Sequence, residues 1–346
     1  MESLNPLFSL VRDYLTHYLP RERKCSPNTV RAYQKSLELL FDYVKVQKSV
    51  SLAKVTFQMI DRNMLSAFLD YLENERHCSP ATRNHRLHCI RAFYAYAAEN
   101  NITAVVSYGE ILKVDAAKVS EKLIEHMSED AVKAIIAQAD TSTNKGLRDM
   151  FLMLFLYKTG ARIQETLDVR LRDIQSGKTP SVTLQGKGEK IRSVPLRENT
   201  AQHLKEYIKM FHANESIYST THLFYTVRNG SKKRMTEDNV RDFVQKYGVK
   251  ARAVCAEVPE NVHPHLFRHS CAMSLYRSGV HLTLISQWLG HANFETTLVY
   301  AHADTEIKRK AIEKAVPEDT PFAKHVNAER YKVNDENVLK QLCGLR

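Results

Sequence analysis

The sequence has few of the features that mark metal proteins, disulfide-stapled secreted proteins or membrane proteins. Its six cysteines are scattered and include no C-x-x-C pair. Neither a zinc site nor a disulfide framework is therefore expected, and a cytoplasmic protein is favoured. No run approaches the roughly 18 apolar residues of a membrane span, so no membrane partner is predicted. The first residues show no basic segment followed by an apolar core, and we expect no signal peptide.

Acidic residues are fewer than basic ones, which is the first clue to a partner. The chain of 346 residues has 39 Asp and Glu against 50 Lys and Arg, a net charge of +11. Such an excess favours a polyanionic partner, and the length allows two domains. A solubilising surface would explain the charge as well, so composition alone does not identify the partner.

The first hundred residues show a helical pattern, with apolar side chains at spacings of three and four. Helices at 28–46 and 80–99 are expected to begin alike, because Ser-Pro precedes each and serine caps a helix whose first residue is proline. Together with a helix at 60–75 and one near the N-terminus, they predict a four-helix domain over residues 1–112. The pattern breaks after residue 100, and we place an interdomain linker at 113–122.

Basic side chains recur on two of these helices and in one later loop. A solvated surface is the plain explanation, and a surface that follows DNA phosphates is the functional one. The candidate DNA-binding residues are Arg31, Lys35, Arg83, Arg86, Arg91, Arg228, Lys232, Lys233 and Arg234.

The rest of the chain is expected to be mostly helical with a small antiparallel sheet, forming a second domain at 123–316. Strand-like runs at 181–185 and 191–196 flank a Gly-rich turn that presents Lys187, which predicts a β-hairpin. The G-K-G turn lacks the spacing of a phosphate-binding loop, so we reject nucleotide binding. The tail at 317–346 ends in a short amphipathic segment, which docks on its own domain or on a neighbouring protomer.

The strongest functional signal lies near the end of the second domain. His265 and Arg268 are three residues apart, so on a helix they share one face. Gly290 is expected to end the next helix with His291 beside it, and Tyr300 is close enough in sequence to return to the same place. Two imidazoles, a guanidinium and a phenol in one pocket suit a negatively charged substrate attacked by an oxygen nucleophile.

A second arginine precedes this region. Arg162 stands at a helix start, and Glu165 three residues later can reach back to orient it; an ordinary surface ion pair is the plain alternative. A zinc site among His263, His265 and His269 is disfavoured, because no cysteine or carboxylate lies at ligand spacing.

Taken in order, these segments resemble the motif set of the tyrosine recombinases, the lambda-integrase and Xer family. T-G-A-R-I-Q-E resembles the first arginine box, H-P-H-L-F-R-H-S-C-A the second, and L-G-H-A-N-F-E-T-T-L-V-Y-A-H the box around the nucleophile. The likeness extends over nearly the whole chain. It implies a mainly α-helical protein with a small antiparallel sheet: a SAM-like core-binding domain that clamps DNA, then the family's catalytic domain.

The resemblance also implies a role for each residue of the site. Tyr300 would attack the scissile phosphate and form a 3′-phosphotyrosine, so that rejoining needs no ATP. Arginines would bind the non-bridging oxygens. No metal and no other cofactor is expected. The implied catalytic residues are Arg162, Lys187 as general acid, His265 as acceptor or positioner of the tyrosine proton, Arg268, His291 and Tyr300, with Glu165 in support.

The implied partner is double-stranded DNA with an inverted-repeat site, held by a homo-tetramer that joins two sites. Accessory proteins stay open, and so does the setting, either integration and excision of a mobile element or Xer-like resolution of multimers. Two rival functions are a type IB topoisomerase, which shares the catalytic core, and a DNA-binding architectural protein with a silent site. The complete motif set favours the recombinase.

Overall fold

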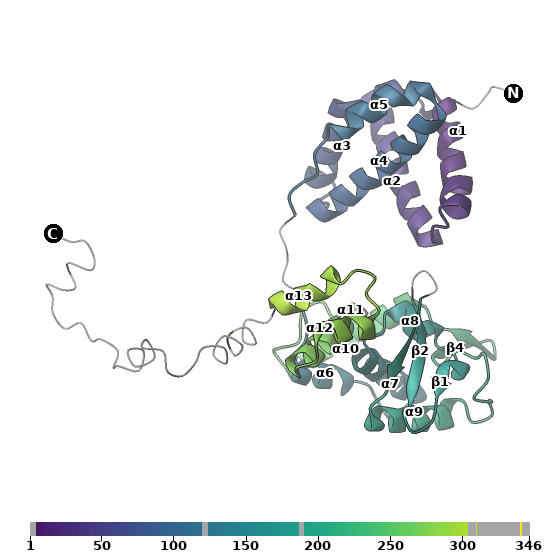
Figure 1. Ribbon diagram of the computed structural model, residues 1–346, viewed down its shortest axis with the longest axis vertical. Coiled ribbons are helices and arrows are strands. Elements are labelled where there is room, and N and C mark those ends of the chain that lie inside the picture. Colours follow the sequence, from purple (N-terminus) through teal and green to yellow (C-terminus); the bar gives the residue numbers. More distant parts are fainter. Residues whose placement is uncertain (1–4, 120–123, 187–189, 304–308, 310–339, 341–346) are drawn as a thin grey trace. The chain divides into compact units, whose positions relative to one another are not determined.

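Figure 1 presents the computed structural model of the chain, which describes residues 5–119, 124–186, 190–303, 309 and 340. The chain divides into two compact units, Met1–Glu121 and Lys122–Arg346. The tail predicted at 317–346 lies outside the described residues apart from residue 340, so its docking stays a prediction. No helix in the described part of the chain is both long and apolar enough to cross a membrane.

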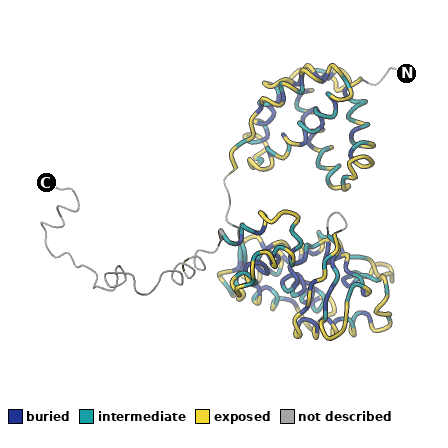
Figure 2. Tube along the Cα trace, viewed as in Figure 1, coloured by how far each residue is buried: buried dark blue, intermediate teal, exposed yellow. Residues whose placement is uncertain are grey.

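The described part of the first unit is built from helices. They are α1 (Pro6–Asp13), the π-helical segment η1 (Tyr14–Glu22), α2 (Pro27–Gln47), the short 3-10 turns η2 (Leu52–Lys54) and η3 (Phe57–Met59), α3 (Arg62–Asn74), α4 (Pro80–Asn100) and α5 (Ile102–Leu112). Their apolar faces form one core, which includes Leu40, Phe68 and Phe93. Figure 2 shows this division, because buried and exposed positions alternate along the helices of the unit.

The two Ser-Pro segments begin helices as predicted. Ser26 Oγ accepts a hydrogen bond from Thr29 N at 3.2 Å, and Ser79 Oγ accepts one from Thr82 N at 3.3 Å. Each proline lies in the first turn, where its missing N–H costs no intrahelical bond. The residues two positions before each serine also match, because both have a left-handed backbone, with φ of 48° and 50°. The repeated capping sequence therefore builds the same turn twice.

Residues 101–112, where the sequence pattern predicted a break, form the helix α5. Asn101 caps it by accepting a hydrogen bond from Thr103 N at 2.9 Å. The expected break was wrong because β-branched residues and a glycine weaken the helical pattern, whereas packing against α4 supports the helix. That packing buries Ala104 and Ile111 completely.

The second unit is mostly helical, with two small antiparallel sheets. Its elements are α6 (Glu129–Ile136), α7 (Asn144–Thr159), α8 (Ile163–Asp168), the 3-10 turn η4 (Leu171–Asp173), β1 (Ile174–Gln175), β2 (Ser181–Gln185), β3 (Ile191–Pro195), α9 (Glu198–Phe211), β4 (Tyr225–Arg228), β5 (Ser231–Arg234), α10 (Glu237–Arg252), α11 (Pro264–Arg277), α12 (Leu282–Leu289) and α13 (Glu295–Ala303). The core surrounds α7, which packs against α6, α8, α9, α10 and α11.

Strand pairing confirms one predicted hairpin and corrects a predicted loop. β2 and β3 pair from Ser181 with Pro195 to Gln185 with Ile191, and β1 adds a third strand. The basic segment 228–234, predicted as a loop, is the β4–β5 hairpin. Its turn residues, Asn229 and Gly230, have φ of 50° and 73°, as an Asn-Gly hairpin turn requires. The Asn-Gly pair is the sequence signal of this hairpin.

Candidate active site

The start of α8 orients the first arginine of the site. Gly160 ends α7 with a left-handed backbone, φ 63°, and the chain turns into α8, of which Arg162 is the N-cap. Glu165 accepts hydrogen bonds from Arg162 N at 2.9 Å and from Arg162 Nη1 at 2.8 Å. The three-residue spacing predicted this contact. Because the Arg162 side chain is 38% exposed, its guanidinium can still meet a substrate.

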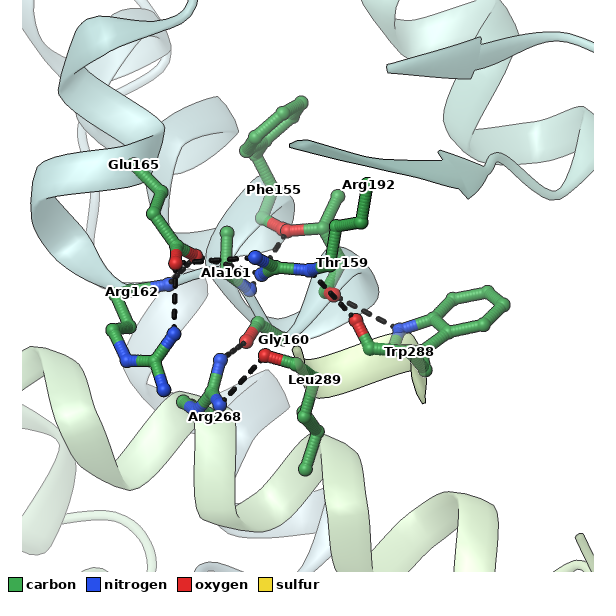
Figure 3. Close-up of polar contacts among 10 residues, drawn as sticks. All are labelled: Phe155, Thr159, Gly160, Ala161, Arg162, Glu165, Arg192, Arg268, Trp288 and Leu289. Atoms are coloured by element: carbon green, nitrogen blue, oxygen red, sulfur yellow. Dashed lines mark hydrogen bonds and ion pairs between the residues drawn. The ribbon is translucent and has the colours of Figure 1, made fainter. Parts of the chain in front are cut away.

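Arg192 on β3 is a central residue of the site that the sequence reasoning missed. Its Nη1 and Nη2 donate to the two oxygens of Glu165 at 3.1 and 2.7 Å, and its Nε donates to Trp288 O at 2.9 Å (Figure 3). A side chain at Gly290 would come within 2.9 Å of Arg192 Nη1, so only glycine leaves room for this approach. Arg192 thus ties the β2–β3 hairpin to Glu165 and to the end of α12.

Glu165 is ionised in this arrangement. Burial raises the pKa of the carboxyl, but hydrogen bonds from Arg192 and Arg162 lower it more, and the net pKa is below the ordinary range. The carboxylate is therefore a fixed anchor between two arginines. Arg192 itself is only 12% exposed in its side chain, which suits an anchoring role better than a substrate contact.

The second predicted arginine is buried at the centre of the site. Arg268 Nη1 donates to Gly160 O at 2.7 Å and Nη2 to Leu289 O at 2.8 Å, as Figure 3 shows. Burial first, and then the charge of Arg162, lower the pKa of Arg268 to about 10, so the guanidinium stays charged at neutral pH. One cation therefore holds together α11, the turn before α8 and the end of α12.

Tyr300 on α13 lies in the same site. Its side chain is almost fully buried, and its hydroxyl lies 3.0 Å from Nδ1 of His269. Burial raises the pKa of Tyr300 to about 12 against the opposing charge of Arg268. The ring of His291 is nearly parallel to that of Tyr300, with centroids 6.4 Å apart, and Nδ1 of His291 lies 2.6 Å from Thr297 Oγ1.

Among the described residues His265 has no hydrogen bond with Tyr300, and its role stays a prediction. It is exposed, and its ring meets that of His269 edge-on, with centroids 4.6 Å apart. Among the residues that the structure describes, His269 and not His265 has a hydrogen bond with Tyr300. His269 is four residues after His265 on α11, so the i, i+4 spacing was available as a signal.

The predicted general acid, Lys187, lies outside the described residues, but the base of its hairpin does not. Gly186 N donates to Lys190 O at 2.8 Å. A side chain added at Gly186 would lie 3.2 Å from Glu165 Oε1 and 3.7 Å from Arg192 Nη1. The residue immediately before Lys187 is therefore beside the arginine–carboxylate cluster.

In the first unit, some of the predicted DNA-binding residues line a groove between α2 and α4. The groove has a volume of about 610 Å³ and is lined by Asn28, Arg31, Ala32, Lys35, Ala81, Thr82, His85 and Arg86. Arg31 and Lys35 are exposed, and Lys35 forms a surface ion pair with Glu38 at 3.0 Å. Arg86 is half-buried and donates from Nη1 to Ser36 Oγ at 3.2 Å.

Two other predicted DNA-binding residues on α4 are used inside the unit. Arg83 Nε lies 3.2 Å from Glu73 Oε2, and Arg83 Nη1 donates to Asp115 O at 3.3 Å. Arg91 Nη2 donates to Leu112 O at 3.2 Å and to Val114 O. These guanidinium groups hold the chain that follows α5 in place, and their predicted contact with DNA stays a prediction.

The four basic side chains of the β4–β5 hairpin lie on its two faces, because side chains alternate between faces along a strand. Lys232 pairs with Glu215 and lies 4.4 Å from the ring centre of Tyr225, and Arg234 Nε lies 2.5 Å from Asp168 Oδ1. The side chains of the other two, Arg228 and Lys233, alternate to the opposite face and have no partner among the described residues.

A helical unit with an exposed cationic groove, and a second unit in which two arginines, histidines and a tyrosine share one site, define a DNA breaking-and-rejoining enzyme. The chain belongs to the phage integrase family, whose model matches residues 125–306, while the family's N-terminal SAM-like domain matches residues 12–101. It is a site-specific tyrosine recombinase.

Curated relatives cover most of the chain. Tyrosine recombinase XerC of Staphylococcus haemolyticus is 31% identical, over 86% of this chain and 93% of its own length. Tyrosine recombinase XerD of Staphylococcus epidermidis is 26% identical, over 87% of this chain and 96% of its own. An integrase/recombinase of Sinorhizobium fredii is 28% identical, over 90% and 92%.

Solved structures have the same fold. XerH site-specific recombinase bound to its difH substrate has a TM-score of 0.63 at 20% identity, covering 91% of this chain and 90% of that one. A lambda integrase dimer bound to a core site has a TM-score of 0.64 at 15% identity, covering 86% and 95%. The likeness extends over both units.

Proposed function

We propose that Tyr300 is the nucleophile of this recombinase and that Arg162 and Arg268 bind the phosphate under attack. The proposal rests mainly on the position of Arg268. Its hydrogen bonds to Gly160 O and Leu289 O bring together the segments that contain Arg162 and His291. Tyr300 lies within the same site, since its hydroxyl contacts His269.

Two guanidinium groups supply what phosphoryl transfer needs at the phosphorus. Negative charge develops on the non-bridging oxygens, and forked N–H donors bind such oxygens in pairs. Arg268 has five N–H groups, of which backbone carbonyls occupy two in the hydrogen bonds described. Because these carbonyls fix it before DNA arrives, little rearrangement is needed. We therefore expect cleavage in the presence of EDTA. The phosphotyrosine bond keeps the energy for rejoining without ATP.

We propose the remaining roles with support from the positions of these residues or of their neighbours. Lys187 is proposed as the general acid at the departing 5′ oxygen, supported by the place of Gly186 beside Glu165. His291 is proposed to donate to a non-bridging oxygen. His265, which is exposed, is proposed to contact the phosphate from the outer edge of α11.

We propose that DNA contacts the groove of the first unit through Arg31, Lys35 and Arg86, and the β4–β5 hairpin through Arg228 and Lys233. Exposed cations of this kind attract phosphates and carry little sequence information. XerH was solved with its difH substrate and lambda integrase as a tetramer on a Holliday junction. By likeness, we propose a homo-tetramer of this chain on two inverted-repeat sites.

The test uses the native chain and Tyr300→Phe on a nicked duplex. The duplex carries a site recovered by repeated selection from random-sequence inverted repeats, which identifies a target without assuming its sequence. The native chain should form an SDS-stable complex, and Tyr300→Phe should bind the duplex with unchanged Kd yet form none. An SDS-stable complex with the variant would overturn the assignment of the nucleophile.

A further inference from the structure

Helix α11 places three polar side chains on one face. His265, Arg268 and His269 are at positions i, i+3 and i+4, so the third lies beside the first two. Within the described residues, the one polar contact of the Tyr300 hydroxyl is Nδ1 of His269, at 3.0 Å. The two rings are 5.9 Å apart between centroids, inclined at 58°. The imidazole thus reaches the phenol from the side, with a nitrogen aimed at its oxygen.

The direction of this hydrogen bond follows from the charge states. Burial first, and then electrostatic interaction with His265 and Arg268, lower the pKa of His269 to about 3, so its imidazole is neutral and has one acceptor nitrogen. The pKa of Tyr300 is about 12, so its phenol keeps its proton at neutral pH. The O–H of Tyr300 therefore donates to Nδ1 of His269, whose own ring hydrogen is on Nε2.

We propose that His269 is a catalytic residue which accepts the proton of Tyr300 as the phenol attacks, and that His265 does not. The inference rests on Tyr300 as nucleophile. The O–H bond of Tyr300 breaks, its proton moves to Nδ1, and the oxygen's electron pair forms the new bond to phosphorus. The bond from phosphorus to the 5′ oxygen breaks, and that oxygen takes its electron pair and a proton from the general acid. In rejoining, the imidazolium returns the proton to the departing phenol.

Bound DNA would make His269 a stronger base. Protonation of His269 is opposed by Arg268 and by the imidazoles of His265, His263 and His291, and three of these four groups are proposed to meet the phosphate. A phosphate among them adds negative charge, which offsets their repulsion of a new proton on Nδ1. Proton transfer is then favoured only when a phosphate is in place. In the absence of DNA the phenol stays protonated and unreactive.

His265 is the alternative acceptor, and its geometry argues against it. It is exposed, it meets His269 by an edge-on ring contact, and it has no hydrogen bond with Tyr300 in the described part of the chain. Its ring is free to act on the phosphate. Of the two histidines of α11, His265 therefore acts on the phosphate and His269 on the Tyr300 hydroxyl.

The experiment compares His269→Asn with Lys187→Ala on the nicked duplex, each with an ordinary and a 5′-phosphorothiolate leaving group. An asparagine amide can place an oxygen where Nδ1 was and keep the hydrogen bond, but it cannot accept the proton. Single-turnover formation of the covalent complex should slow about 10²–10⁴-fold. Because the defect is at the nucleophile, the phosphorothiolate should not restore it. In Lys187→Ala it should restore most of the rate.

Two further measurements keep the result interpretable. DNA affinity and thermal unfolding of His269→Asn should match the native chain, and added imidazole should restore part of the rate of His269→Gly. The proposal is overturned if His269→Asn cleaves within about threefold of the native rate, or if the phosphorothiolate restores it. Absence of any adduct with the native chain would instead contradict the proposed function.

Discussion

The groove of the first unit and the active site of the second both contain basic side chains, but these differ in how deeply they are buried. In the groove, Arg31 and Lys35 are exposed, and their attraction to phosphates is screened by salt. In the site, Arg268 is 2% exposed and is held by two backbone carbonyls. An exposed cation attracts DNA phosphates from many directions, whereas the N–H groups of a buried, hydrogen-bonded cation point in fixed directions. We therefore expect the groove to set binding and the site to set the rate.

A large effect is expected from Arg268→Lys, which keeps the charge but loses the forked arrangement of donors. A lysine has one nitrogen in place of Nη1 and Nη2, so it cannot reproduce their two directions toward Gly160 O and Leu289 O or offer paired donors to a phosphate. Cleavage should fall about 10³-fold, measured as single-turnover covalent complex. DNA affinity should change little. If Kd weakens as much as the rate falls, the division between binding and rate is wrong.

Lys187→Ala tests whether the hairpin belongs to the site. We expect cleavage of ordinary DNA to slow about 10²–10⁴-fold, because the 5′ oxygen then leaves without a proton. A 5′-phosphorothiolate, which needs no proton, should restore most of the rate. Failure of this substrate to restore cleavage would place the general acid on another residue.

Arg192→Ala tests the arginine that the sequence did not reveal. The substitution leaves Arg162 as the one arginine bonded to Glu165. Because removing one partner of a buried ion pair is strongly destabilising, the free energy of unfolding should fall by about 3–5 kcal/mol. Urea unfolding measures this decrease. Arg197→Ala, at an exposed position after the same strand, is the matched control. Cleavage should also slow, by about 10²-fold, because Arg162 loses a fixed anchor.

The same variant has a predicted pH dependence. The pKa of Glu165 is lowered in the native fold, so its contribution to stability is present above the unfolded pKa and is lost as pH falls through the folded one. Without Arg192, burial acts with less opposition and raises that pKa. The stability lost on acidification should therefore be smaller in Arg192→Ala than in the native chain. Identical pH profiles for the two proteins would contradict the anchoring role.

The smallest effect is expected in the groove. Arg31→Ala should weaken binding to all DNA sequences and reduce the slope of log K against log salt by about 1. The cleavage rate at saturating protein should not change. Arg83→Ala is the matched variant on the neighbouring helix. Since Arg83 bonds Glu73 and Asp115 O, it should lower stability by about 1–2 kcal/mol and leave the salt slope intact. The reverse pattern would restore Arg83 as a DNA contact.

Local sequence rules predicted the elements that carry the site. The cap at Ser26, the left-handed glycines at Gly160 and Gly290, and the bond from Arg162 to Glu165 all depend on residues within four positions of each other. Such features are visible in one sequence because their geometry is nearly fixed by spacing. The weakly patterned α5 was missed because its support comes from α4.

Long-range partners could not be predicted in the same way. Arg192 meets Glu165 across 27 positions and Trp288 across 96, so no spacing rule reveals the contact, although its alternation with buried Val194 places it on the inner face of β3. Burial also decides which basic side chains are already bonded within the protein. Arg83 and Arg31 look alike in sequence, and only packing shows that one is already engaged.

We propose that the buried Arg268 and its neighbours direct the phenol of Tyr300 to a phosphorus atom. Protease digestion of the SDS-stable complex, followed by mass spectrometry of the DNA-linked peptide, measures this directly. We predict that the nucleotide is attached to Tyr300. Attachment to another residue, such as Tyr276 on α11 or Tyr157 on α7, would contradict the account.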